Sequence, residues 1–88
     1  MLRAMALAND RLDHERARAL VEAGEILSLE EILKKLFTRY EGNLLETELE
    51  EEDGVIVYEI ELLRSDGQVV ELFFDARSGE LIKTKAGD

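Results

Sequence analysis

Few residues in this sequence have the types and spacing that catalysis requires. His14 is the only histidine, the side chain that most often acts as an acid or base near neutral pH, and no nucleophile or orienting partner accompanies it on its charged stretch. Ser28, Ser65 and Ser78 stand in contexts typical of a helix cap or a turn, with no base beside them. The sequence also has no glycine-rich phosphate loop, so we predict a protein that is not an enzyme and uses no cofactor.

The candidate metal ligands belong to an acidic run at residues 46–53, in which Glu46, Glu48 and Glu50 alternate with other residues. Carboxylate oxygens are the ligands that hard cations prefer, but the spacing does not match a calcium-binding loop. Alternating glutamates on a strand point to one side, into solvent, and protect an edge strand against aggregation. We therefore predict a solvated strand face and no metal site. A protein that binds a cation or a small molecule through this run remains a further hypothesis.

Composition and charge limit the classes of partner. The chain has 88 residues with 11 Lys and Arg against 21 Asp and Glu, a net charge of −10. This balance argues against nucleic acid and against an anionic membrane surface, because both require clustered basic side chains. No apolar run approaches the length of a membrane span, and the absence of cysteine excludes disulfides. The hydrophobic content of 45% indicates a folded domain rather than an acidic disordered tail.

The first nine residues contain a pattern that resembles the end of an export signal. Ala6, Leu7 and Ala8 have the A-x-A form that signal peptidase accepts, although the apolar stretch before them is short. Residues 1–9 are therefore either the remnant of an export signal or an ordinary alanine-rich N-terminus. We predict that residues 10–88 form a single domain, since a chain of this length has room for one core.

Two helices are predicted in the first half of the chain. Residues 10–24 carry a narrow apolar stripe at helical spacing that ends at Gly24. Residues 28–40 carry a wider apolar face, and Ser28 with Glu31 forms a capping box at its start. The wider face marks the second helix as the main partner of the core.

From residue 43 onward the hydrophobic period changes to two, which is typical of β-strands. Turn signals separate four alternating segments: Asp53-Gly54, Ser65-Asp66-Gly67 and Arg77-Ser78-Gly79. The pattern predicts an α+β fold in which the two helices pack on a four-stranded antiparallel meander. In the last hairpin, either Leu81 or Ile82 could face the core.

Turn lengths fix the expected strand register. A two-residue turn at Asp53-Gly54 pairs Leu45 with Leu62, and a three-residue loop with a left-handed Gly67 continues the apolar face into the next strand. The predicted core face comprises Leu45, Leu49, Ile56, Tyr58, Ile60, Leu62, Val70, Leu72 and Phe74. On the opposite face the same register places Glu61 against Glu71.

The opposite face of the sheet also carries apolar side chains that a two-layer domain does not need. They are Leu44, Leu63 and Val69, expected side by side, with Val57 and Phe73 further along. One interpretation is that the N-terminal helix covers this row or that its exposure has no role. The other is that the five residues form a surface for a protein partner or a second copy of the chain.

The second half of the chain resembles the PepSY domain. The resemblance rests on V-Y-E-I-E-L-L at residues 57–63 and on S-D-G-Q-V-V-E-L-F-F-D-A-R-S-G-E-L at residues 65–81. Tyr58, Asp66-Gly67, Asp75-Ala76 and Ser78-Gly79 stand at the fixed positions of that pattern. Residues 26–40 are similar to the family's opening helix.

The resemblance implies a helix packed on an antiparallel sheet, with no catalytic residues. PepSY domains occur in propeptides of secreted metallopeptidases and in cell-surface regulatory proteins, and short exported bacterial members are similar to the N-terminal part of this chain. The resemblance therefore implies a periplasmic or secreted, non-catalytic binding module that regulates or inhibits a protein partner such as a peptidase. The alternative is a structural or sensory homodimer without a peptidase partner.

Overall fold

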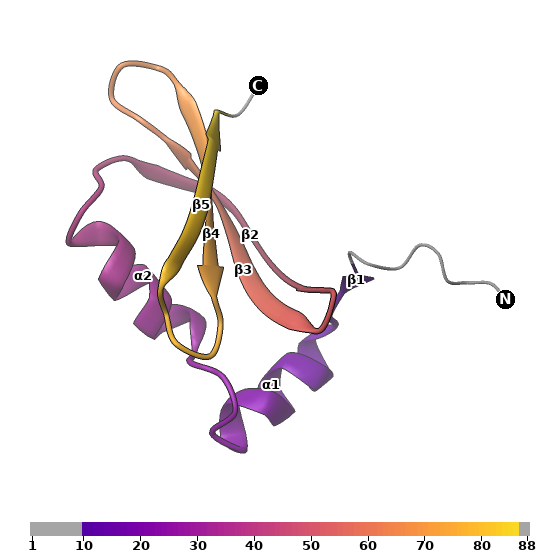
Figure 1. Ribbon diagram of the computed structural model, residues 1–88. Coiled ribbons are helices and arrows are strands. Elements are labelled where there is room, and N and C mark those ends of the chain that lie inside the picture. The colour runs from indigo at the N-terminus through magenta and orange to yellow at the C-terminus, as the bar shows by residue number, and fades with distance from the viewer. Residues whose placement is uncertain (1–9, 87–88) are drawn as a thin grey trace, which may run out of the picture.

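The computed structural model describes residues 10–86. The predicted remnant of an export signal at residues 1–9 thus lies outside the described residues. In order along the chain, the elements are β1 (Asp10–Arg11), α1 (His14–Glu22), α2 (Leu29–Phe37), β2 (Asn43–Glu52), β3 (Val55–Leu63), β4 (Val69–Asp75) and β5 (Leu81–Ala86). The strands form one sheet in the order β1-β2-β3-β4-β5 with antiparallel neighbours (Figure 1). Two helices on an antiparallel meander confirm the predicted α+β fold.

Helix α2 lies across one face of the sheet (Figure 1) and supplies the helical half of the core. Its predicted capping box is present: the Glu31 amide donates to Ser28 Oγ at 3.2 Å, and the Ser28 amide donates to Glu31 Oε1 at 3.0 Å. These two bonds satisfy backbone donors that a helix start otherwise leaves unpaired. Ile32 and Leu36 of the apolar face are fully buried against the sheet.

Helix α1 begins at His14 and not at Asp10, because Asp13 caps it by accepting a hydrogen bond from the Arg16 amide at 2.8 Å. Asp10–Arg11 form the short strand β1 instead, paired with β2. The apolar side chains of α1 and its entry are half-buried and pack against the same core cluster as α2. Of the two interpretations of the apolar row on the opposite face, the one in which this helix covers it is therefore wrong.

The first hairpin follows the predicted turn chemistry. Asp53 and Gly54 both have positive φ, at 50° and 81°, as a type I′ turn requires. The register next to this turn is as predicted, with Leu49 opposite Tyr58. Further along β2, a register shift between residues 44 and 46 inserts one extra residue, and Leu45 is 49% exposed. The predicted place of Leu45 in the core was therefore wrong, because a β-bulge displaces it.

The remaining two hairpins join β3 to β4 and β4 to β5. Tyr58 lies opposite Phe74 in the core, as the three-residue loop predicted. In the last hairpin Phe74 pairs with Leu81, which packs on the core, and a second bulge leaves Ile82 49% exposed. The Tyr58 hydroxyl donates to the Leu27 carbonyl at 2.8 Å and joins the sheet to the segment before α2.

We expect Gly67→Val to destabilise the protein by roughly 1–3 kcal/mol, whereas Ser65→Ala changes stability by less than about 0.5 kcal/mol. Gly67 has φ of 87°, and no atom lies within 4 Å of the position that a Cβ would occupy. The cost therefore comes from the left-handed backbone alone and not from a clash. Urea denaturation of both variants measures it, and equal losses would show that the turn does not depend on this conformation.

Candidate functional site

Two residues of the predicted apolar surface are not available to a partner. Val57 and Phe73 are only 4% and 6% exposed. The Lys83 and Lys85 ammonium groups lie 4.8 Å and 5.9 Å from the centre of the Phe73 ring, so β5 covers this side chain with cation–π contacts. The apolar part of this face is therefore largely closed within the chain.

The other three residues of that surface do not form the expected row. Leu63 and Val69 lie opposite each other and are half-buried. Leu44 pairs with the core residue Leu62, and Asn43 stands opposite Leu63. The reason is the β-bulge in β2, which shifts the register by one residue and moves Leu44 away from the other two. That these residues bind a partner stays a prediction.

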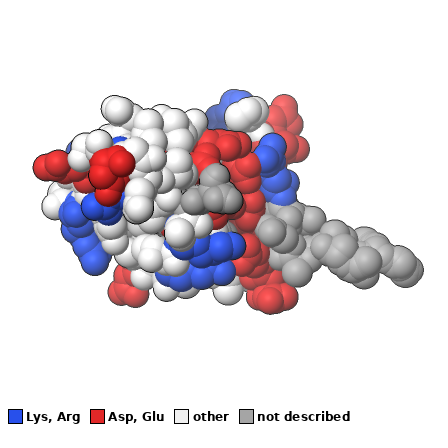
Figure 2. Space-filling model, turned by 90° about the horizontal axis from the view of Figure 1, so that it is seen from above, with Lys and Arg blue, Asp and Glu red and all other residues white. Residues whose placement is uncertain are grey.

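Acidic side chains dominate the face of the sheet that lies away from the helices. The members of this acidic face are Glu46, Glu48, Glu50, Glu59, Glu61 and Glu71. Glu48 lies opposite Glu59, and Glu61 lies opposite Glu71 as the register predicted. Figure 2 shows acidic side chains gathered in a band beside a broad uncharged region. Like charges on paired strands repel, so this arrangement costs stability.

Glu50 departs from the prediction of a solvated acidic strand. It is 7% exposed, and its Oε1 atom is buried without a hydrogen-bond partner. Burial and the neighbouring carboxylates of Glu48 and Glu59 raise the pKa of Glu50 to about 8. Burial also raises the pKa of Glu59, whereas the side-chain hydrogen bond with Glu50 lowers the pKa of Glu48. The face thus holds one carboxyl group that keeps its proton at neutral pH.

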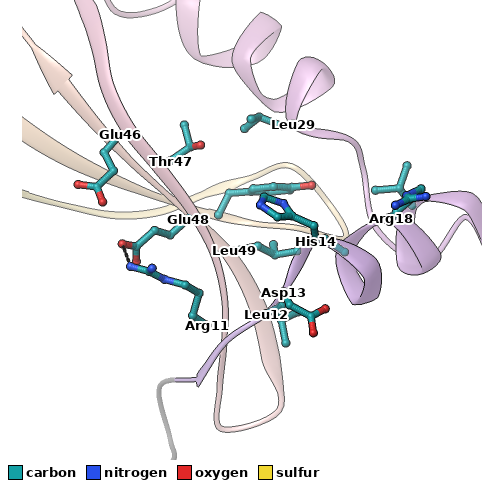
Figure 3. A pocket seen from close by; sticks show the side chains of 13 residues that line it. Arg11, Leu12, Asp13, His14, Arg18, Leu29, Glu46, Thr47, Glu48 and Leu49 are labelled. Atoms are coloured by element: carbon teal, nitrogen blue, oxygen red, sulfur yellow. Dashed lines mark hydrogen bonds and ion pairs between the residues drawn. The ribbon is translucent and has the colours of Figure 1, made fainter.

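A groove opens on the other side of the sheet, between α1, the start of α2 and strand β2 (Figure 3). Its volume is about 570 Å³. Its apolar lining consists of Leu12, Ala17, Val21, Leu29, Leu49 and Tyr58. Its polar and charged lining consists of Arg11, Asp13, His14, Arg18, Glu46, Thr47 and Glu48. An apolar floor with a few polar groups is typical of a binding site.

The groove runs beside an unpaired part of the sheet edge. β1 pairs only with Glu50 and Glu51, and the Leu12 amide donates to the Leu49 carbonyl at 2.8 Å. Beyond this point no strand among residues 10–86 pairs with this side of β2. Backbone groups alternate sides along a strand, so the amide and carbonyl of Thr47 face the same edge as those of Leu49. They are available to an added strand.

Sequence analysis did not predict this groove, because residues 10 and 11 were assigned to the helix. One signal was present: Asp13 is a favoured N-cap residue, and a helix that begins after it leaves Asp10 and Arg11 free to pair with β2. His14, which sequence analysis found without a nucleophile or orienting partner, is exposed and lines the groove. The three serines lie at the predicted cap and turns.

One of three comparisons with known proteins finds a match. None of the helices among residues 10–86 is long and apolar enough to cross a membrane. Neither the curated proteins nor the solved structures searched contain a match. Residues 26–85 match the PepSY family model, described as "Peptidase propeptide and YPEB domain". This match covers most of the chain, from the segment before α2 to β5, and the chain therefore belongs to the PepSY family.

Proposed function

We propose that this chain is a non-catalytic periplasmic or secreted module whose groove receives an extended segment of a protein partner, such as a peptidase, and thereby regulates or inhibits it. PepSY domains are generally propeptide or regulatory modules without catalysis of their own, which supports a binding role. The observation that carries the proposal is the position of the apolar groove directly beside the unpaired edge of β2.

The groove and the unpaired edge of β2 together offer the two kinds of contact that an added strand makes. The free amide and carbonyl of Thr47 give an incoming segment its register through main-chain hydrogen bonds, and the apolar floor at Leu49 and Tyr58 receives alternate side chains. The net charge of −10 favours a partner with a basic surface, because complementary charge accelerates encounter. The proposed partner is therefore a protein with an extended, apolar segment flanked by basic residues.

We expect Ala17→Trp to weaken partner binding at least about tenfold, because the indole fills part of the groove. Ala17 is half-buried and lines the cavity, whose volume of about 570 Å³ has room for the larger side chain. Ala19→Trp is the matched control, since it places the same side chain on the exposed part of α1. The test is capture of periplasmic proteins on the purified chain and its variants, followed by affinity measurement and peptidase assay with the protein retained.

A protein retained by wild type and Ala19→Trp but lost with Ala17→Trp would support the proposal. Equal retention by all three would contradict it. Sedimentation equilibrium of the wild type tests the homodimer alternative: a dimer that Ala17→Trp dissociates, with no other protein captured, would assign the groove to self-association instead.

A further inference from the structure

Among residues 10–86, Glu50 is the charged residue that is buried, on the face of the sheet away from the helices, and the proposed partner site leaves it unexplained. Its Oε1 atom has no hydrogen-bond partner. Arg11 stands opposite Glu50 on β1, but its guanidinium forms an ion pair with Glu48. A buried carboxyl oxygen without a partner is costly, and such an atom is commonly completed by a bound species.

Two further carboxylates lie close to the carboxyl group of Glu50. Oxygen atoms of Glu48, Glu50 and Glu59 all lie within 4.8 Å of one another. Ca²⁺ holds its oxygen ligands about 2.3–2.6 Å away, so two ligands on one ion stand at most about 5 Å apart. The separations between the three oxygens are thus of the size found between ligands of one calcium ion.

The pairing of β2 with β3 holds these three carboxylates close together. Glu48 and Glu59 are directly opposite each other on β2 and β3, and Glu50 is two residues along on the same face of β2. Adjacent to them lies a small cavity of about 60 Å³. It is lined by Glu46, Glu48, Glu59, Glu61 and Glu71. This cavity gives room for water ligands, and its carboxylates add to the negative potential that attracts a cation.

We propose that Glu48, Glu50 and Glu59 form a binding site for a hard divalent cation of the size of Ca²⁺, with water completing the coordination. The ligand set is entirely carboxylate, which favours calcium over metals that prefer nitrogen or sulfur. Such an ion supplies the missing partner of Glu50 Oε1 and offsets the repulsion between β2 and β3. Glu48 also lines the groove on the other side of β2, so the ion alters the charge beside the proposed partner site.

The test uses the complete chain and Ca²⁺ alone. Isothermal titration calorimetry measures the affinity, and thermal melting followed by circular dichroism measures the stabilisation that a ligand of the folded state produces. The variants are Glu50→Gln and Glu59→Gln. Glu51→Gln is the matched control, because it removes the same charge from the next position of β2, on the other face of the strand.

We expect wild type and Glu51→Gln to bind Ca²⁺ with similar affinity and to melt several degrees higher in millimolar Ca²⁺ than in KCl of equal ionic strength. Glu50→Gln and Glu59→Gln should each weaken the affinity at least about tenfold and abolish the rise in melting temperature. Absence of Ca²⁺ binding by the wild type would overturn the proposal. An equal loss in Glu51→Gln would also overturn it, since that would reveal diffuse attraction to the acidic surface.

Discussion

Replacing Phe74 by alanine is expected to lower the free energy of unfolding by roughly 3–5 kcal/mol. This loss is a large part of the total stability of a domain of this size. Phe74 is 3% exposed and pairs with Tyr58 on β3 and with Leu81 on β5. Its truncation leaves a cavity where these strands meet, and the rigid sheet cannot collapse around it. Circular dichroism in increasing urea gives the change in free energy.

Phe37→Ala is the control for this variant. Phe37 is the last residue of α2 and is 45% exposed, so its truncation removes the same atoms without opening a cavity in the core. We expect it to cost less than about 1 kcal/mol. If the two variants were equally destabilised, the core would not be centred on the pairing of β3 with β4.

The wild-type protein is expected to lose roughly 2–4 kcal/mol of stability as the pH rises from about 5 to about 8, in buffers that contain a chelator. The cause is Glu50, whose pKa is raised by burial from an ordinary value near 4.5 to about 8. Below the ordinary value both the folded and unfolded states hold the proton. Between the two values only the folded state holds it, so each rise in pH favours unfolding until the pH passes the folded-state value.

The charged groups that face Glu50 set the size of this effect. They are Glu48 on its own strand, Glu59 on β3 and Arg11 on β1. The raised pKa of Glu59 acts in the same direction. The lowered pKa of Glu48 opposes it, because that carboxylate contributes stability above its unfolded-state value.

The Glu50→Gln variant distinguishes the effect of Glu50 on the pH dependence of stability from the effect of general repulsion among the acidic residues. The amide cannot ionise, so the variant should keep most of its stability at pH 8, whereas Glu51→Gln should follow the wild type. Urea denaturation at a series of pH values gives both curves. A Glu50→Gln curve as steep as that of the wild type would show that Glu50 does not carry its proton in the folded state.

The hairpins were predictable because turn chemistry is local. Asp53-Gly54 and Gly67 demand positive φ, and these conformations fixed the register that places Tyr58 beside Phe74. The capping box at Ser28 was equally predictable from the sequence. The bulge at Leu45 was not, because Leu44 and Leu45 are both apolar and either can continue the alternation.

The candidate sites depend on contacts between segments distant in sequence, so sequence analysis did not predict the groove and gave cation binding by the acidic run only as a further hypothesis. Pairing of β1 with Glu50 and Glu51 creates the groove, yet two residues of strand have no detectable period. The predicted register did set Glu48 opposite Glu59, but alternation alone assigned Glu50 to solvent. Its burial follows from how the strands and their neighbours pack, and a strand pattern carries no information on that.

Hydrogen exchange of the chain, free and bound to the protein that it captures, tests most directly whether the groove beside β2 is the partner site. We expect slower exchange of the Thr47 amide in the complex, because it gains a strand partner, together with protection of α1 around Ala17. The amides of β5, at the opposite edge of the sheet, should exchange at unchanged rates. Protection confined to β5 or to the acidic face, with Thr47 unaffected, would contradict the proposed function.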